Sequence, residues 1–208
     1  MSRWNPTVAF SAGITLAVSG VLVIPSLVGS LGWFDQVSGM VSLATIALPV
    51  IVGGAIAGSS LAGAWRGIAG FALAFPVGVA LPTFAVISLD AMSGREPWPK
   101  VLLLFLGIFA LSFGTMGGIG VALLVKPWQS VLRVASSFAG AGAVGGTALT
   151  LTMFFATRQH ALLYSEAIMS IGILATFLLP AVISGRYLDR FLKSAELRFK
   201  PSIRKTVS

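Results

Sequence analysis

The sequence predicts an all-α, polytopic membrane protein: a six-transmembrane-helix bundle followed by a C-terminal amphipathic helix. Of its 208 residues, 56% are hydrophobic and only 10% are charged, whereas a soluble domain carries about 25% charged residues. Its mean hydropathy is +0.96, and a soluble core of this size could not bury so much apolar surface. Six long uncharged stretches divide the chain, and these three observations together define the fold class.

Each of the six stretches is long enough to cross a bilayer, because about 18 consecutive apolar residues suffice for a transmembrane helix. None contains Asp, Glu, Lys, Arg, His, Asn or Gln. In order along the chain they are residues 7–28, 37–64, 67–89, 101–125, 134–157 and 167–185. We therefore expect one transmembrane domain over residues 1–185 and a basic cytoplasmic tail over residues 186–208.

The connections between the spans are short on one side and longer on the other. Trp65 and Arg66 are the only residues between spans two and three, which predicts an antiparallel hairpin. Residues 126–133 form a second short connection on the same side. The segment 90–100 on the opposite side contains two prolines and a glycine, and it predicts an irregular loop.

Positive charge predicts the orientation of the bundle. If the N-terminus is cytoplasmic, 11 of the 14 Lys and Arg residues fall on the cytoplasmic side, as the positive-inside rule requires. Seven of these cations are in the tail, so the tail dominates the bias. We expect a multi-pass protein of the plasma (inner) membrane with both termini cytoplasmic.

The tail carries an amphipathic pattern. Apolar residues recur on one helical face, and acid-to-base pairs stand four residues apart. A basic helix of this kind is typical of a segment that lies on anionic headgroups, and docking of a cytoplasmic partner is the alternative. The residues predicted to contact the membrane surface are Arg186, Arg190, Lys193, Arg198 and Lys200.

Small residues recur at four-residue spacing in several spans and allow helix backbones to approach closely. They predict either internal packing or a face for another membrane protein, and the stripe in the first span is the best candidate for an outward face. The residues are Ala9, Gly13, Ala17, Gly54, Gly58, Gly114, Gly118, Gly142 and Gly146.

Prolines and hydroxyls suggest where a solute could bind. Pro76 and Pro82 interrupt the backbone hydrogen bonding of the third span, and such breaks are tolerated at membrane depth beside protein or a water-filled cavity. Ser112 and Thr115 in the fourth span supply hydroxyl groups. We predict a solute cavity lined by these four residues, although hydroxyls within spans often bond only to their own helix.

No catalytic constellation is apparent. The chain has no cysteine and one histidine, too few ligands for a zinc or haem site, and it lacks nucleotide-binding and serine-nucleophile motifs. The spans hold none of the ionisable groups that mark proton or ion coupling. We therefore expect no enzymatic activity and no cofactor, catalytic or metal site.

Two functions remain open. The first is a membrane transport protein or transport subunit for a small solute, non-enzymatic by itself and driven by a partner. The alternative is a structural or assembly subunit of a larger membrane protein complex. Expected partners are the lipid bilayer, anionic lipids at the cytoplasmic face, and another membrane protein or a second copy of the chain, but not nucleic acid.

Overall fold

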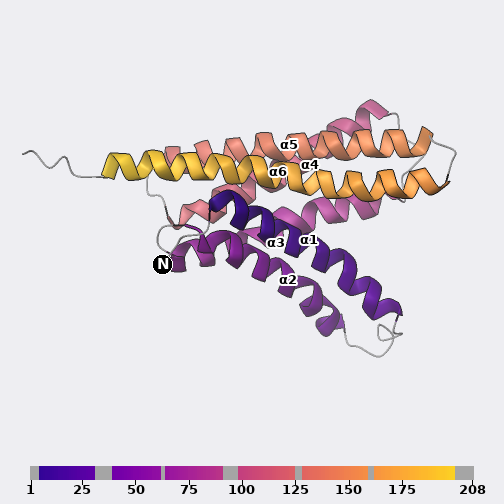
Figure 1. The fold of residues 1–208 in the computed structure, drawn as a ribbon, viewed down its shortest axis with the longest axis horizontal. Coiled ribbons are helices and arrows are strands. Elements are labelled where there is room, and N and C mark those ends of the chain that lie inside the picture. The colour runs from indigo at the N-terminus through magenta and orange to yellow at the C-terminus, as the bar shows by residue number, and fades with distance from the viewer. Residues whose placement is uncertain are drawn as a thin grey trace, which may run out of the picture.

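The computed structural model describes an all-helical protein (Figure 1). Its backbone is described for residues 5–30, 39–61, 64–90, 98–124, 128–158 and 162–199, and its side chains for residues 5–21, 47–61, 65–79, 82, 99–124, 128–155 and 171–194. Six helices account for nearly all of the described backbone: α1 (Pro6–Ser30), α2 (Gly39–Ser59), α3 (Ala64–Asp90), α4 (Trp98–Ala122), α5 (Trp128–Arg158) and α6 (Leu162–Phe199).

The helices form a closed ring in chain order. Each packs against its neighbours in the sequence, and α6 packs back against α1. Figure 1 shows α5 and α6 running side by side along the long axis, with α1 and α2 inclined to them. The first and last helices are thus neighbours in space.

Local chemistry sets the start of α1. The side-chain Oδ1 of Asn5 accepts a hydrogen bond of 2.9 Å from the backbone N–H of Thr7, which is the usual role of an N-cap residue. Pro6 follows at the first helical position, where its missing N–H costs nothing. The Asn-Pro pair therefore positions the helix start just before the first predicted span.

The hairpin between α2 and α3 differs from the sequence expectation. Helix α2 ends at Ser59, where the N–H of Leu61 donates to the carbonyl of Gly58 at 3.1 Å. Trp65 lies in the first turn of α3 rather than in a loop. The hydropathy pattern missed this turn because its residues are as apolar as the helices they join.

The last two helices are also longer than their predicted spans. Helix α5 begins at Trp128, so Arg133 lies on the helix and not in a connection. Helix α6 runs without interruption from the last span into the tail and has 38 residues, a length of about 57 Å at 1.5 Å per residue. Arg133 and Arg186 bounded the predicted spans, but neither residue ends a helix.

Three of the six helices contain stretches that are long and apolar enough to cross a membrane, namely Pro99–Ala122, Trp128–Phe155 and Ile171–Ser194. Among the residues with described side chains, the apolar stretches of the first three helices are shorter: Pro6–Val21, Ala47–Ser59 and Trp65–Val79. The prediction of a membrane protein is therefore supported through three of its six spans.

A cluster of four phenylalanine side chains fills the centre of the ring of helices. Phe10 of α1 lies 5.7 Å from Phe71 and 5.6 Å from Phe75, both on α3, and 5.4 Å from Phe138 on α5, measured between ring centroids. All three pairs have edge-to-face geometry, which suits the ring quadrupoles. All four side chains are fully buried, so alternate helices of the ring meet at this cluster.

A second aromatic cluster joins α4 and α6. Phe109 packs between Phe105 and Phe113 of its own helix, and it lies 5.7 Å from Phe177 of α6. These side chains reach across α5 because α5 presents glycine there: Gly145 stands against Phe109 on one side and Pro180 on the other. The two clusters together occupy the interior of the described bundle.

Replacement of Phe10 by alanine should destabilise the whole bundle, because Phe10 joins three helices. We expect a loss of about 3–5 kcal/mol, the usual cost of replacing a buried phenylalanine by alanine and leaving a cavity. Unfolding in increasing sodium dodecyl sulfate, followed by circular dichroism, measures the loss. Phe155→Ala is the matched control, because Phe155 is 53% exposed, and it should change stability by no more than about 0.5 kcal/mol. Equal losses in both variants would contradict the central role of Phe10.

Candidate functional site

The small-residue stripe of α1 packs inside the protein. An added Cβ at Gly13 would overlap the carbonyl oxygen of Gly53 on α2, and an added Cβ at Gly53 would overlap that of Gly13. Ala9 and Ala17 on the same stripe are fully buried. The alternative of an outward face for this stripe is therefore corrected, because α2 covers Gly13.

The other predicted small-residue positions also lie against the next helix of the ring. Gly54 and Gly58 on α2 stand against backbone atoms of Phe71 and Gly67 on α3. The remaining four positions build the α4–α5 interface, as follows: Gly114 and Gly118 of α4 against Ala135 and Ala139 of α5, and Gly142 and Gly146 of α5 against Phe109 and Phe105 of α4.

Three further glycines, which the sequence reasoning did not single out, build the last two interfaces. On α5, an added Cβ at Gly145 would come within 2.6 Å of the carbonyl oxygen of Thr176 on α6. Gly172 of α6 faces Thr152 of α5, and Gly185 of α6 lies against Thr7 of α1. These glycines do not form a four-residue repeat on one helix, so the sequence pattern does not identify them as packing positions.

The four residues predicted to line a solute cavity are not brought together around one. Ser112 is fully buried, and its Oγ donates to the carbonyl of Ile108 at 2.7 Å. Thr115 donates to Leu111 at 2.7 Å and faces the outer surface between α4 and α5. Pro76 and Pro82 lie within α3. Thr115 lines a groove on the outer surface between α4 and α5, whereas Ser112, Pro76 and Pro82 do not line it.

Most buried hydroxyls are satisfied within their own helices. Thr150 and Thr176 are buried, and each donates to the carbonyl four residues earlier, at 2.9 and 2.7 Å. Ser11 of α1 and Ser184 of α6 are different. Their hydroxyl oxygens are buried and have no hydrogen-bond partner among the described residues. Ser11 and Ser184 thus lie on α1 and α6, the two helices whose contact closes the ring.

A groove runs along the outer surface between α4 and α5. Its volume is about 610 Å³. Gly114, Gly118, Ala135 and Ala139 lie along its floor, and larger apolar side chains form its walls. Trp128, the first residue of α5, borders one end of the groove and is 66% exposed. The lining is almost entirely apolar, so the groove suits an apolar occupant.

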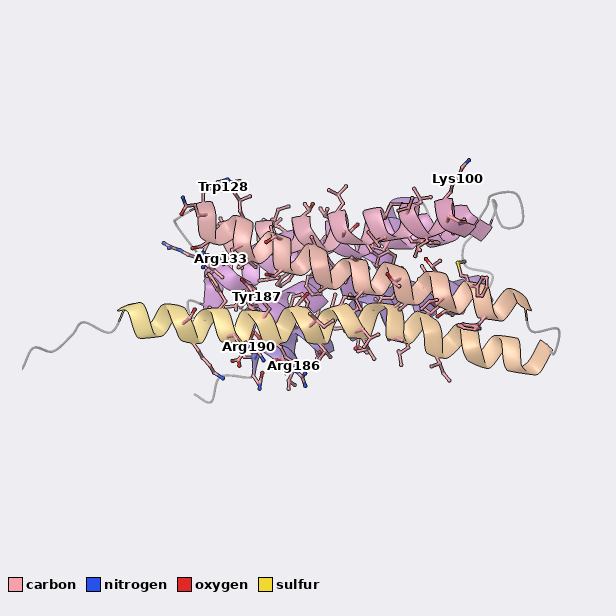
Figure 2. All side chains as sticks on the ribbon, turned by 90° about the horizontal axis from the view of Figure 1, so that it is seen from above. Lys100, Trp128, Arg133, Arg186, Tyr187 and Arg190 are labelled. Atoms are coloured by element: carbon pink, nitrogen blue, oxygen red, sulfur yellow. The ribbon has the colours of Figure 1, made fainter. Side chains whose placement is uncertain are left out.

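Charged residues divide between the two ends of the bundle (Figure 2). Arg133, Arg186 and Arg190 lie at the same end as Trp128, whereas Lys100 lies at the opposite end. All four of these cationic side chains reach the protein surface. The separation provides one basic end, built from the start of α5 and the C-terminal half of α6.

The tail of α6 packs partly on the protein itself. Leu188 is 1% exposed and belongs to the core, and Phe191 and Leu192 are packed against that core. Leu188 belongs to the apolar face of the amphipathic pattern. That pattern predicted contact with the membrane surface, but Leu188 packs inside the protein instead. Lys193 extends outward and pairs with Asp189 at 2.7 Å. The side chain of Arg198 and the whole of Lys200 lie outside the described residues.

No group of three or more His, Asp or Glu residues that could hold a metal ion occurs in the described part of the chain. Comparison with known proteins gives no relationship: no protein-family model, no curated protein and no solved structure matches this chain. A proposed function must therefore rest on the geometry of the bundle.

Gly13→Leu should lower the stability of the bundle, because the new side chain would force α1 and α2 apart. Overpacking of this kind costs about 1–3 kcal/mol. Thermal unfolding of the detergent-solubilised protein measures the change. Gly140→Leu on α5 is the matched control, since an added Cβ there meets no atom within 4 Å, and its melting temperature should stay near that of the wild type. A stable Gly13→Leu variant would show that α1 and α2 do not depend on this contact.

Proposed function

We propose that this chain is a multi-pass protein of the plasma membrane, that all six helices cross the bilayer, and that it serves as a non-enzymatic subunit of a larger membrane assembly. Helix length supports the six crossings. The shortest helix, α2, has 21 residues, and about 20 residues span a hydrocarbon layer of about 30 Å. Helices α1 and α3 have 25 and 27 residues.

The distribution of apolar side chains supports a lipid environment. Phenylalanines fill the interior, while Leu103, Leu111 and Ile171 are 69%, 66% and 69% exposed on the outer faces of α4 and α6. Large exposed apolar surfaces are unusual on a soluble monomer. Within a bilayer, the same side chains contact acyl chains at no cost.

The basic end supports a cytoplasmic position for the C-terminal half of α6. Arg133, Arg186 and Arg190 share that end with Trp128. This arrangement fits the positive-inside rule and the preference of tryptophan for the headgroup layer. Because α6 is about 57 Å long at 1.5 Å per residue, its C-terminal turns extend beyond the hydrocarbon layer and are available to a cytoplasmic partner.

The packed interior favours an assembly subunit over a solute carrier. The two phenylalanine clusters occupy the centre, and buried hydroxyls such as Thr150 and Thr176 bond to their own helices. A solute path through the ring would require both clusters to separate. The outer faces and the basic end, by contrast, are available without rearrangement.

Transport of a small solute is the second candidate, and one observation favours it. The unpaired hydroxyls of Ser11 and Ser184 lie on α1 and α6, where a polar solute could satisfy them. Prolines inside α2, α3 and α6 provide points at which these helices can bend. A thermal-shift screen against metabolites tests this alternative, and binding that is lost in Ser11→Ala and Ser184→Ala would favour it.

Membrane topology can be tested with single cysteines, because the natural chain contains none. In intact cells, a membrane-impermeant maleimide should label Lys100→Cys and leave Arg190→Cys unlabelled. Permeabilisation should make both accessible. The reason is that the two residues lie at opposite ends of the bundle. Labelling of both variants from outside would contradict the proposed crossing and orientation.

Assembly can be tested by affinity purification in a mild detergent with a tag on the N-terminus. The wild type should retain other membrane proteins, and the double variant Arg186→Glu/Arg190→Glu should retain less of them, since it reverses the charge of the basic end. Lys100→Glu at the opposite end is the matched control and should keep the association. A wild type that elutes alone as a monodisperse monomer would contradict this function.

A further inference from the structure

The groove between α4 and α5 has the shape of a site for a single extended chain. Gly114 and Gly118 of α4 face Ala135 and Ala139 of α5 along its floor. An added Cβ at Gly118 would meet only the Cβ of Ala135, at 3.4 Å, so the floor is open above this glycine. Small floor residues and larger walls leave a channel parallel to the helix axes.

The length of the groove matches one leaflet of a bilayer. Its lining extends from Ala110 to Ala122 along α4, which is about 18 Å at 1.5 Å per residue. Half of a hydrocarbon layer of about 30 Å is about 15 Å. An acyl chain that starts at the headgroup level would thus run the length of the groove and end near the bilayer midplane.

The end of the groove next to Trp128 has the chemistry of the headgroup layer. The Trp128 indole is exposed there and is suited to the membrane–water interface. Arg133 lies at the same end (Figure 2), one helical turn from Ser136 in the groove wall. It has no acidic partner among the described side chains, and an arginine binds phosphate with paired hydrogen bonds.

We propose that this groove binds one acyl chain of an anionic phospholipid from the leaflet next to Trp128, with Arg133 contacting the headgroup phosphate. The site is distinct from the α6 tail, since its residues come from α4 and the first half of α5. The inference rests on the proposed position of α4 and α5 in the bilayer, but not on the assembly role, because a lipid could occupy the groove in a carrier or in an assembly subunit.

The test measures retained lipid by native mass spectrometry. The protein is reconstituted in nanodiscs of equal parts phosphatidylcholine and phosphatidylglycerol and then released into detergent. The wild type should retain one phosphatidylglycerol. Gly118→Leu should lose it because the new side chain fills the groove. Gly140→Leu adds the same side chain where nothing lies within 4 Å, and this control should retain the lipid.

The headgroup contact is tested separately with Arg133→Gln. This variant should still retain a phospholipid, but its preference for phosphatidylglycerol over phosphatidylcholine should fall about fivefold, the effect of one arginine at an anionic surface. Lys100→Gln, at the opposite end of the bundle from the groove's Trp128, should leave that preference unchanged. An unchanged preference in Arg133→Gln would exclude Arg133 from the headgroup site.

Two results would overturn the proposal as a whole. The first is a folded Gly118→Leu variant that retains as much phosphatidylglycerol as the wild type. The second is a wild-type dimer that Gly118→Leu converts into a monomer, because the groove would then hold a helix of a second copy. If Gly118→Leu does not fold, a phosphatidylglycerol with a photoreactive acyl chain decides the question in the wild type. Its crosslinks should map to α4 and α5, and crosslinks confined to other helices would contradict the site.

Discussion

Close contact between helix backbones, made possible by glycine, is the constraint on which this bundle depends. Lipid supplies no hydrophobic force that drives helices together, so association rests on close packing. Every interface of the ring contains a glycine that lies against the adjacent helix, from Gly13 between α1 and α2 to Gly185 between α6 and α1. Because these contacts involve backbone atoms, a side chain at such a position cannot be accommodated by a change of rotamer.

The interior follows from this close approach. Helices that touch through glycine leave a narrow centre, and planar rings such as Phe10 and Phe138 fill it efficiently. Most of the hydroxyls that remain inside, such as those of Ser112 and Thr150, bond to their own helices, and those of Ser11 and Ser184 have no partner among the described residues. The available chemistry is therefore on the outside of the ring, in the α4–α5 groove and at the basic end of α5 and α6.

Much of the helical architecture could be predicted from sequence, and the reasons for the failures are physical. Long uncharged stretches predicted six helices, but the ends of α5 and α6 were misplaced because Arg133 and Arg186 interrupt an apolar run without disturbing helical geometry. The four-residue spacing of glycines identified packing positions, but it could not predict which helix each glycine contacts. For the Gly13 stripe the sequence left internal packing and an outer face open, because only the fold brings Gly53 opposite to it. The groove was missed because it requires two helices in register.

The closure of the ring has a consequence for synthesis. Thr7 and Phe10 belong to α1, which precedes the other five helices of the ring along the chain, but part of their packing surface is supplied by Gly185 of α6. Until α6 has been synthesised, this side of α1 lacks its packing partner in the ring. Earlier helices can pair with their neighbours as they are made, whereas closure of the ring must wait for α6.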